Sequence, residues 1–225
     1  MCGRFAYFVP YEQLTDHYGL ASAAPPMERY NVAPSQDILA IRRAESGERT
    51  AAPLKWGLIP HWAKDPTIGN RMINARGETV AEKPAFRQAF KRRRCIIPAS
   101  GFYEWGPSGA GKWPYYITPA DGPLLSFAGL WERWRTPDGE PLESCTIITT
   151  AANESLARIH QRMPVCLAEA SYADWLDPEA ASETCLALLK PLPDAAFEIR
   201  PVAKTVNNPR NDSAELVRPV EIPSA

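Results

Sequence analysis

Several hallmarks of common protein classes are missing from this chain of 225 residues. No segment approaches the roughly 18 apolar residues that a membrane-spanning helix needs, so we expect no membrane contact. No basic segment followed by an apolar one opens the chain, so no secretory signal is expected. The net charge of −1 argues against a protein that coats nucleic acid by charge alone. The basic residues do cluster at 87–94, a pattern typical of a solvated helix face.

The five cysteines are odd in number and widely spaced, and no C-x-x-C or Cys/His cluster is present. The spacing therefore predicts neither a zinc site nor a disulfide framework. Cys95, Cys145 and Cys166 lie in apolar runs and are typical of small core residues. A reducing cytosol suits such free thiols, so we expect a cytoplasmic protein.

The sequence contains no linker, repeat or low-complexity tract, so we expect one domain over residues 1–225. Its 23 prolines are scattered, which favours short strands and turns over long helices. These patterns predict an α+β fold with a mostly antiparallel, barrel-like β core and short peripheral helices. The expected strands are 38–42, 51–56, 95–98, 102–105 (ended by Gly106-Pro107), 114–118, 125–131, 144–150 and 197–202. The expected helices are 11–18, 84–93, 150–159, 172–176 and 180–188, and 160–165 is expected to be an irregular loop.

The first five residues, Met1-Cys2-Gly3-Arg4-Phe5, carry distinctive chemistry. A Met before a small residue is normally trimmed, which would leave Cys2 as the mature N-terminus. Its free α-amine, with a reference pKa of about 7.7–8.0, would then stand beside its thiol as a 1,2-aminothiol. Such a group condenses with an aldehyde to an imine and closes to a thiazolidine; alternatively, the thiol alone attacks an acyl or amide carbon. A Cys that has no role beside the start codon explains these two residues equally well.

Three further polar residues are candidates for proton transfer or positioning. Glu104 lies in an aromatic strand, where a carboxylate is costly unless it is paired and where burial raises carboxyl pKa values. Strand alternation places it on one face with Phe102. His160 lies in a loop that Pro164 holds extended, and Asn74 lies on a short apolar strand where its amide needs a partner. Each also has a purely structural explanation: an ion pair for Glu104, and hydrogen bonds for His160 and Asn74.

Six ordered motifs connect these candidates. They are Met1-Cys2-Gly3-Arg4-Phe5, Tyr30-Asn31-Val32-Ala33-Pro34, Trp56-Gly57-Leu58-Ile59-Pro60, Asn74-Ala75-Arg76-Gly77-Glu78-Thr79, Cys95-Ile96-Ile97-Pro98 with Gly101-Phe102-Tyr103-Glu104-Trp105, and His160-Gln161-Arg162-Met163-Pro164. In order and spacing they resemble the SRAP family (SOS-response-associated peptidases), proteins that attach themselves to abasic sites in single-stranded DNA. The resemblance runs nearly from end to end. One departure is Gly77, where an Ala is expected.

The resemblance implies a covalent mechanism. The Cys2 amine would form an imine with the open abasic sugar at C1, and the Cys2 thiol would close the thiazolidine, which shields the site. The resemblance assigns Glu104 as the acid/base that helps to open the sugar and to reverse the link. It assigns His160 as a second proton-transfer group and Asn74 as the residue that positions the N-terminus. An autoproteolytic or peptidase activity, which frees Cys2, and an abasic-site lyase activity belong to the same expectation.

Charged and flat side chains near these motifs indicate DNA contacts. Arg4, Arg76 and Arg162 are expected to hold phosphates beside the reactive centre. Trp62 and Trp105 offer flat faces on which bases stack, at roughly 1–3 kcal/mol per base. The expected partner is single-stranded DNA that contains abasic sites. We expect a monomer that needs no cofactor or metal and that associates with the nucleoid when it is bound to DNA.

Two other functions remain open from the sequence alone. Glutamine amidotransferases of the N-terminal-nucleophile type also begin Met-Cys-Gly, and their thiol attacks an amide while the free amine acts as the base. The downstream glutamine-binding and oxyanion motifs of that class are not found. The other alternative is a non-catalytic binder of modified or single-stranded DNA in which Cys2 is incidental. Cys2→Ala abolishes covalent chemistry in an enzyme of either kind and has no effect in a passive binder.

Overall fold

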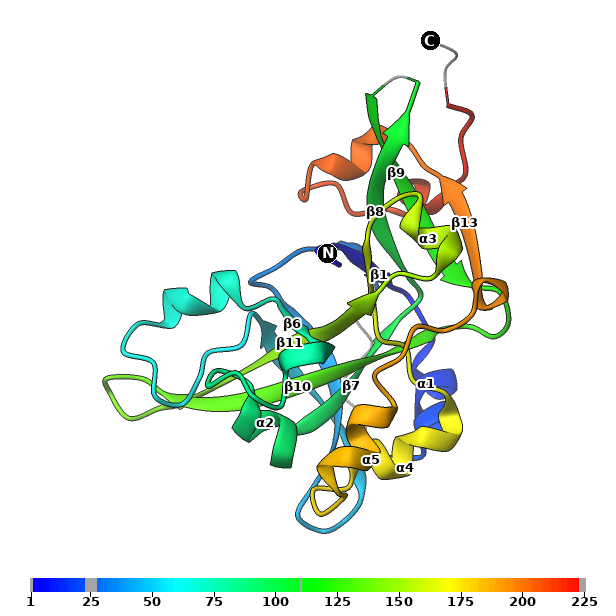
Figure 1. Ribbon diagram of the computed structural model, residues 1–225. Coiled ribbons are helices and arrows are strands. Elements are labelled where there is room, and N and C mark those ends of the chain that lie inside the picture. The colour runs from blue at the N-terminus through cyan, green and yellow to red at the C-terminus, as the bar shows by residue number, and fades with distance from the viewer. Residues whose placement is uncertain (1, 23–27, 110, 223–225) are drawn as a thin grey trace.

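Stretches of alternating or continuous apolar residues form the strands of this chain. The computed structural model describes residues 2–22, 28–109 and 111–222. Two sheets meet near the middle of the molecule, with short helices at their margins (Figure 1). All strands expected from the sequence are present, and the α+β class is confirmed.

The larger sheet closes on itself. Its central strands are β4 (Asp37–Arg43), β5 (Arg49–Trp56), β7 (Arg94–Ala99), β10 (Leu125–Arg135) and β11 (Pro141–Ala151). The path β11-β10-β7-β4-β5 is antiparallel throughout. β5 then returns to β11 as a parallel pair in which Trp56 lies opposite Cys145. The result is a five-strand mixed barrel, whose closure leaves no exposed edge on these strands.

Short strands extend the barrel and a second sheet stands beside it. The barrel is extended by β2 (Leu20–Ser22), β6 (Asn74–Arg76) and β12 (Arg162–Pro164). The second sheet has the order β13 (Phe197–Pro201), β9 (Gly111–Pro119), β8 (Gly101–Ser108), β1 (Phe5–Tyr7) and β3 (Arg29–Val32). The N-terminal strand β1 therefore lies between β3 and β8, with Phe5 opposite Phe102. Because only Ser100 separates β7 from β8, the two sheets are fixed to each other at this point.

Aromatic side chains fill the space between the sheets. The ring of Phe5 lies 5.3 Å from that of Trp56 and 6.1 Å from that of Phe127. Phe102 contacts Phe127 edge-on at 6.0 Å. Cys2 belongs to the same buried cluster, as do the three cysteines predicted for the core. The start of the chain is therefore part of the core, and burial of these large side chains is a major source of stability.

The helices are short. They are α1 (Tyr11–Tyr18), α2 (Arg87–Arg92), α3 (Glu154–Ala157), α4 (Tyr172–Leu176) and α5 (Ser182–Ala187). The 3₁₀ turns are η1 (Pro66–Arg71), η2 (Gly77–Thr79), η3 (Glu169–Ser171), η4 (Asp194–Ala196), η5 (Lys204–Asn207) and η6 (Ala214–Val217). Helix α1 has the predicted bounds: it follows Pro10 and ends at Gly19, whose left-handed φ of 60° suits a residue without a Cβ. None of the described helices is long and apolar enough to cross a membrane.

Three predicted helices are shorter than expected, and of the helix predicted over 180–188 only α5 (Ser182–Ala187) forms. The helix predicted over 84–93 begins only at Arg87, because the chain before it forms turns in which the carbonyl of Thr79 accepts from the amide of Lys83. The helix predicted over 150–159 begins at Glu154, because Thr150 pairs with Met163 in the barrel. Its cap is Asn153, whose side-chain oxygen accepts from the amide of Leu156 at 3.0 Å.

Two other boundaries were wrong because the residues concerned pair with another strand. The expected loop 160–165 contains β12, which pairs with the end of β11. Gly106 and Pro107 do not end the strand that carries Glu104, because they continue the ladder opposite Trp113 and Lys112. The basic run is also only partly solvated. Arg94 is buried, and its guanidinium donates to the carbonyls of Phe90, Lys91, Trp175 and Asp177.

Candidate active site and nucleic-acid interface

Cys2 lies three residues before the start of β1 and is fully buried. Burial, and after it the nearby carboxylate of Glu104, raises the pKa of the Cys2 thiol well above its usual value. A thiol with a raised pKa stays protonated near neutral pH and is a poor nucleophile by itself. Any covalent chemistry at Cys2 therefore needs a base nearby or an electrophile that is already activated.

Asn74 holds the backbone of Cys2. It lies on β6, which runs parallel to β11 and places Asn74 opposite Ile147. Its side-chain Nδ2 donates to the carbonyl oxygen of Cys2 at 2.9 Å. Its Oδ1 is buried and accepts no hydrogen bond from the described residues. Because a buried carbonyl oxygen without a partner costs free energy, this atom is available to a donor on a bound substrate.

Glu104 lies on β8 and is only 5% exposed. As alternation predicted, Phe102 faces the large core cluster that contains Cys2, while Tyr103 and Trp105 pack in a second cluster on the other face. The charge of Glu104 contributes to the raised pKa of the Cys2 thiol, so the two groups, both buried, interact electrostatically.

His160 follows helix α3, and its ring orientation is fixed by the backbone. Its Nδ1 lies 3.0 Å from the amide nitrogen and 3.2 Å from the carbonyl oxygen of Arg162. The preceding residue, Ile159, packs against Gly106 of β8. A Cβ at Gly106 would lie 3.0 Å from Cγ2 and 3.1 Å from Cα of Ile159. Gly106 therefore allows the strand of Glu104 and the segment of His160 to approach closely, a role that the sequence analysis missed.

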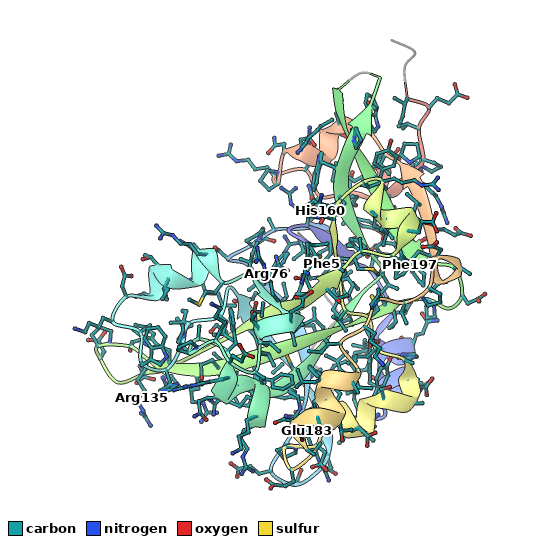
Figure 2. The ribbon with its side chains drawn as sticks, in the orientation of Figure 1. Phe5, Arg76, Arg135, His160, Glu183 and Phe197 are labelled. Atoms are coloured by element: carbon teal, nitrogen blue, oxygen red, sulfur yellow. The ribbon has the colours of Figure 1, made fainter. Side chains whose placement is uncertain are left out.

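A groove of about 580 Å³ opens beside Asn74. We call it the reactive groove; it is lined by Trp62, Met72, Asn74, Arg76, Thr79, Lys83, Pro84, Ala85 and Phe86. Two predicted site residues of β6, Asn74 and Arg76, are thus brought together with a third, Trp62, which comes from a different segment. Lys83 is a further cation that sequence reasoning missed, since nothing in the local pattern distinguishes it from other surface lysines. In Figure 2, His160, Phe5 and Arg76 lie around the region where the two sheets meet, and Arg135 lies at the far end of the barrel.

Arg4 and Trp105 are less open than the sequence analysis expected. The Nη1 of Arg4 donates to the side-chain oxygen of Asn31 at 2.7 Å and to the carbonyl of Val206 at 2.8 Å. Its guanidinium lies 5.9 Å from the ring of Trp105, and burial lowers its pKa. The indole of Trp105 in turn donates to the side chain of Asn207 at 2.7 Å. Both residues are therefore anchored to the segment around η5.

Asn31 is the centre of that anchor, and sequence reasoning missed it. It is fully buried in β3, and its Nδ2 donates to the carbonyls of Val206, Asn208 and Asn211 at 3.2, 3.1 and 2.7 Å. Its backbone amide donates to Asp212 at 3.1 Å. An Asn flanked by Tyr30 and Val32 in a strand was the available signal, because a buried amide must find partners.

Arg162 is engaged within the protein. Its guanidinium forms a two-pronged pair with Glu78, at 2.5 and 2.9 Å, and also donates to the carbonyl of Thr149 at 2.7 Å. The hydrogen bond from Arg162 lowers the pKa of Glu78. These contacts tie β12, β11 and η2 together beside Asn74. Of the three arginines that were expected to contact phosphates, only Arg76 is exposed to solvent, and it lines the reactive groove.

The described residues contain no group of three or more His, Cys, Asp or Glu side chains placed to hold a metal ion.

The family model "SOS response associated peptidase (SRAP)" matches residues 1–209. The abasic site processing protein YoqW of Bacillus subtilis (strain 168) is 45% identical over 222 residues, which cover 96% of this chain and 99% of that protein. The chain belongs to the SRAP family.

More distant SRAP relatives cover almost the whole chain. The abasic site processing protein HMCES of Mus musculus is 33% identical over an alignment that covers 99% of this chain and 77% of that protein. A crystal structure of a protein from Bacteroides thetaiotaomicron superposes with a TM-score of 0.88 at 28% identity, covering 98% of this chain and all of that one. The resemblance indicated by the six motifs is confirmed, and the barrel with its companion sheet matches the fold of that SRAP-like structure.

Proposed function

We propose that this SRAP protein processes abasic sites in single-stranded DNA by attaching itself to them through Cys2. The observation that carries the proposal is the contact between Asn74 and the backbone of Cys2 at the edge of the reactive groove. It fixes the N-terminal residue next to a cationic groove and within the electrostatic reach of Glu104. The names of the relatives, which are abasic site processing proteins, agree with this reading.

The proposed reaction begins once Met1 has been removed. Glu104 and His160 exchange protons with the closed sugar, so that its C1 hydroxyl loses a proton, its ring oxygen gains one, and the aldehyde opens. The Cys2 amine adds to the aldehyde carbon, and loss of one water gives the imine. The Cys2 sulfur then bonds to the same carbon. The thiol proton passes through Glu104 to the nitrogen, and the thiazolidine closes.

The raised pKa of the Cys2 thiol supports this order of steps. A protonated thiol does not compete with the amine for the aldehyde, so the imine forms first. Once its nitrogen is protonated, the imine carbon is a stronger electrophile than the aldehyde, and the carboxylate of Glu104 can take the thiol proton as the carbon–sulfur bond forms. The same carboxylate can return that proton to sulfur, which makes the link reversible. The proposal uses only groups of the chain and requires no activity on other proteins.

The experiment is a denaturing gel combined with intact mass, using protein verified to begin at Cys2. The DNA is a single strand with one abasic site, beside an undamaged strand of the same sequence. We expect a shifted band that requires the abasic site, with a mass equal to the sum of protein and DNA less one water. Cys2→Ala keeps an N-terminal amine but has no thiol, so it should give only an imine that survives denaturation after borohydride reduction.

Two outcomes would contradict the proposal. If no adduct forms from a protein that begins at Cys2, the covalent mechanism is wrong, and glutamine hydrolysis and passive DNA binding become the next assays. If Cys2→Ala forms a stable adduct without reduction, the link does not involve the thiol. Monomeric behaviour and a preference for single strands belong to the same proposal; the mass of the native protein in solution tests the first, and competition by duplex DNA tests the second.

A further inference from the structure

A second groove lies on the opposite side of Trp62, and no step of the proposed reaction uses it. It has a volume of about 750 Å³. We call it the flank groove; its walls include His61, Trp62, Arg87, Arg93, Trp131 and Arg133. Three arginines and the exposed indole of Trp62 lie on this concave surface, and proteins hold single-stranded nucleic acid with such groups, since guanidinium groups bind phosphates and indoles stack on bases. The ring of Trp131 is already covered by the guanidinium of Arg42 at 4.4 Å.

The flank groove is continuous with the reactive groove. Trp62 and Pro84 line both, so these two residues form the ridge between them. The indole nitrogen of Trp62 lies 3.5 Å from the carbonyl oxygen of Pro84, and the side chain remains 49% exposed. A strand that leaves the reactive groove can therefore cross an exposed aromatic face and enter the flank groove directly.

A buried carboxylate organises the floor of the flank groove. Glu132 is only 3% exposed and pairs with Arg93 at 2.7 Å and with His61 at 3.4 Å. Its other oxygen accepts from the backbone amide of Arg133 at 2.9 Å. Because the charge of Glu132 is compensated from three directions, it holds the surrounding basic side chains in place.

Two arginines at this groove remain open to a ligand. The side chain of Arg133 is 57% exposed, although it pairs with Glu143. Arg87 is exposed and forms no ion pair with any residue that the structure describes. One acidic residue, Glu45, also lines the groove and is exposed to solvent.

We propose that the flank groove binds the unpaired nucleotides next to the abasic site on one side. Arg87 and Arg133 contact their phosphates, and the base nearest the lesion stacks on Trp62. The inference rests on the proposed function. Its physical reason is that an abasic nucleotide has no base to stack, so the affinity for the damaged strand has to come from its neighbours. Stacking and phosphate contacts are tolerant of sequence, which suits damage that occurs next to any base.

The test uses DNA with a stable tetrahydrofuran analogue of the abasic site, which binds but does not crosslink. Three single strands are compared: one with several nucleotides on both sides of the analogue, one trimmed on the 5′ side and one trimmed on the 3′ side. For the wild type, trimming one of the two sides should weaken binding roughly tenfold, as loss of charge-assisted contacts predicts. Trimming the other side should have a much smaller effect.

The decisive protein is the double variant Arg87→Ala/Arg133→Ala. It should bind the full strand about as weakly as the wild type binds the strand whose trimming weakens binding. Trimming on that same side should then reduce the affinity of the variant only slightly. Its dependence on log salt should be shallower by about two, one for each lost phosphate contact. Arg218→Ala, which alters an exposed arginine paired with Glu215, is the matched control and should behave like the wild type.

The inference is overturned if the double variant and the wild type lose the same factor on trimming, or if neither flank matters. Thermal unfolding of both variants shows whether a loss of binding reflects a loss of folding. Authentic abasic DNA then separates the two proposals. An adduct that forms without any dependence on the flank contradicts only the flank groove, whereas no adduct with any strand contradicts the proposed function.

Discussion

The reactive centre, formed by Cys2, Asn74 and Glu104, and the flank groove, which shares Trp62 and Pro84 with the reactive groove, are built in opposite ways. At the centre, Cys2 and Glu104 are buried in the core, and a side-chain amide holds the Cys2 backbone. In the flank groove, Trp62 and Arg133 are about half exposed. Proton transfer and ring closure need groups in fixed positions with perturbed pKa values, and burial supplies both. Sequence-tolerant binding needs charge and flat apolar surface that solvent and ligand can reach.

This difference implies that substitutions at the centre act on stability and reactivity together, whereas substitutions in the groove act on affinity alone. The buried side chains are part of the packing, so removing one alters the fold as well as the chemistry. The exposed ones contribute little to folding. Five changes test how far this division holds.

The largest effect is expected when the residue before Cys2 is retained. An acylated nitrogen has no lone pair available for an imine, so a protein with an uncleaved N-terminal extension should form no adduct at all. A tag followed by a protease site that leaves Cys2 first provides the control, since the same preparation can be assayed before and after cleavage. Noncovalent affinity for the tetrahydrofuran strand should change far less. An adduct that retains the tag would show that the amine is not the reacting group.

Asn31→Ala should cost the most stability. The substitution leaves the carbonyls of Val206, Asn208 and Asn211 without their shared donor and removes an acceptor from Arg4. Since each buried polar group left unpaired costs about 1–3 kcal/mol, and water reaches some of them, we expect a loss of about 2–4 kcal/mol in the free energy of unfolding. Urea denaturation measures it. Trp62→Ala is the exposed counterpart and should leave the unfolding midpoint almost unchanged.

Gly106→Ala should test whether the relative position of Glu104 and His160, and not only their presence, controls the reaction. The added methyl group would lie 3.0 Å from Ile159, so the segment of His160 has to shift or the strand of Glu104 has to move. Overpacking of this kind costs about 1–3 kcal/mol. We expect the rate of adduct formation to fall at least as steeply as stability, while noncovalent affinity stays within a factor of about two. If the rate is unchanged, the close approach of the two segments serves packing only.

The sequence predicted those parts of the fold that depend on local signals. Helix α1 is defined by Pro10 and Gly19, and the alternation of Phe102 and Tyr103 correctly assigned the two faces of β8. Thr150 was correctly placed at the end of a strand, but the helix predicted to begin there begins only at Glu154, because Thr150 pairs with Met163 in a strand that only the folded barrel creates. Strand pairing also decided the errors at 160–165 and at Gly106-Pro107.

The three arginines show the same limit for the site. Arg4, Arg76 and Arg162 are equivalent in the sequence, since each lies within a motif beside a candidate catalytic residue. In the fold, Arg4 binds a carbonyl 202 residues away and Arg162 binds a carboxylate 84 residues away. Arg76 lines the reactive groove. The motifs identify which residues lie near the site. They do not identify the hydrogen-bond and ion-pair partners of each arginine, because these partners come from distant segments.

Alkaline pH should weaken the core and spare the groove. Burial raises the pKa values of Cys2, Cys145 and Cys166, so the native state holds protons that the unfolded chain releases above a pKa of about 8.5. The stability that these thiols contribute is therefore complete below that pH and is lost as the pH rises above it. In this range each of these thiols should lower the free energy of unfolding by about 1.4 kcal/mol per pH unit. Denaturation of wild type and Cys2→Ala between pH 8 and about 10 should show the shallower decline for the variant.

Gly77→Ala should have the smallest effect and the opposite sign. A methyl group there would lie 3.4 Å from Cβ of Leu189 and 3.4 Å from the carbonyl oxygen of Thr149, which is ordinary contact, and the backbone of Gly77 is not in the left-handed region. Because Ala restricts the unfolded chain more than Gly, the substitution should stabilise the protein by about 0.4–1 kcal/mol. The site lies next to Arg76 and Glu78, yet the rate of adduct formation should not change. Destabilisation would mean that Leu189 cannot move by the few tenths of an ångström that tight packing demands. In that case the rigid packing of the centre extends to the margin of the reactive groove.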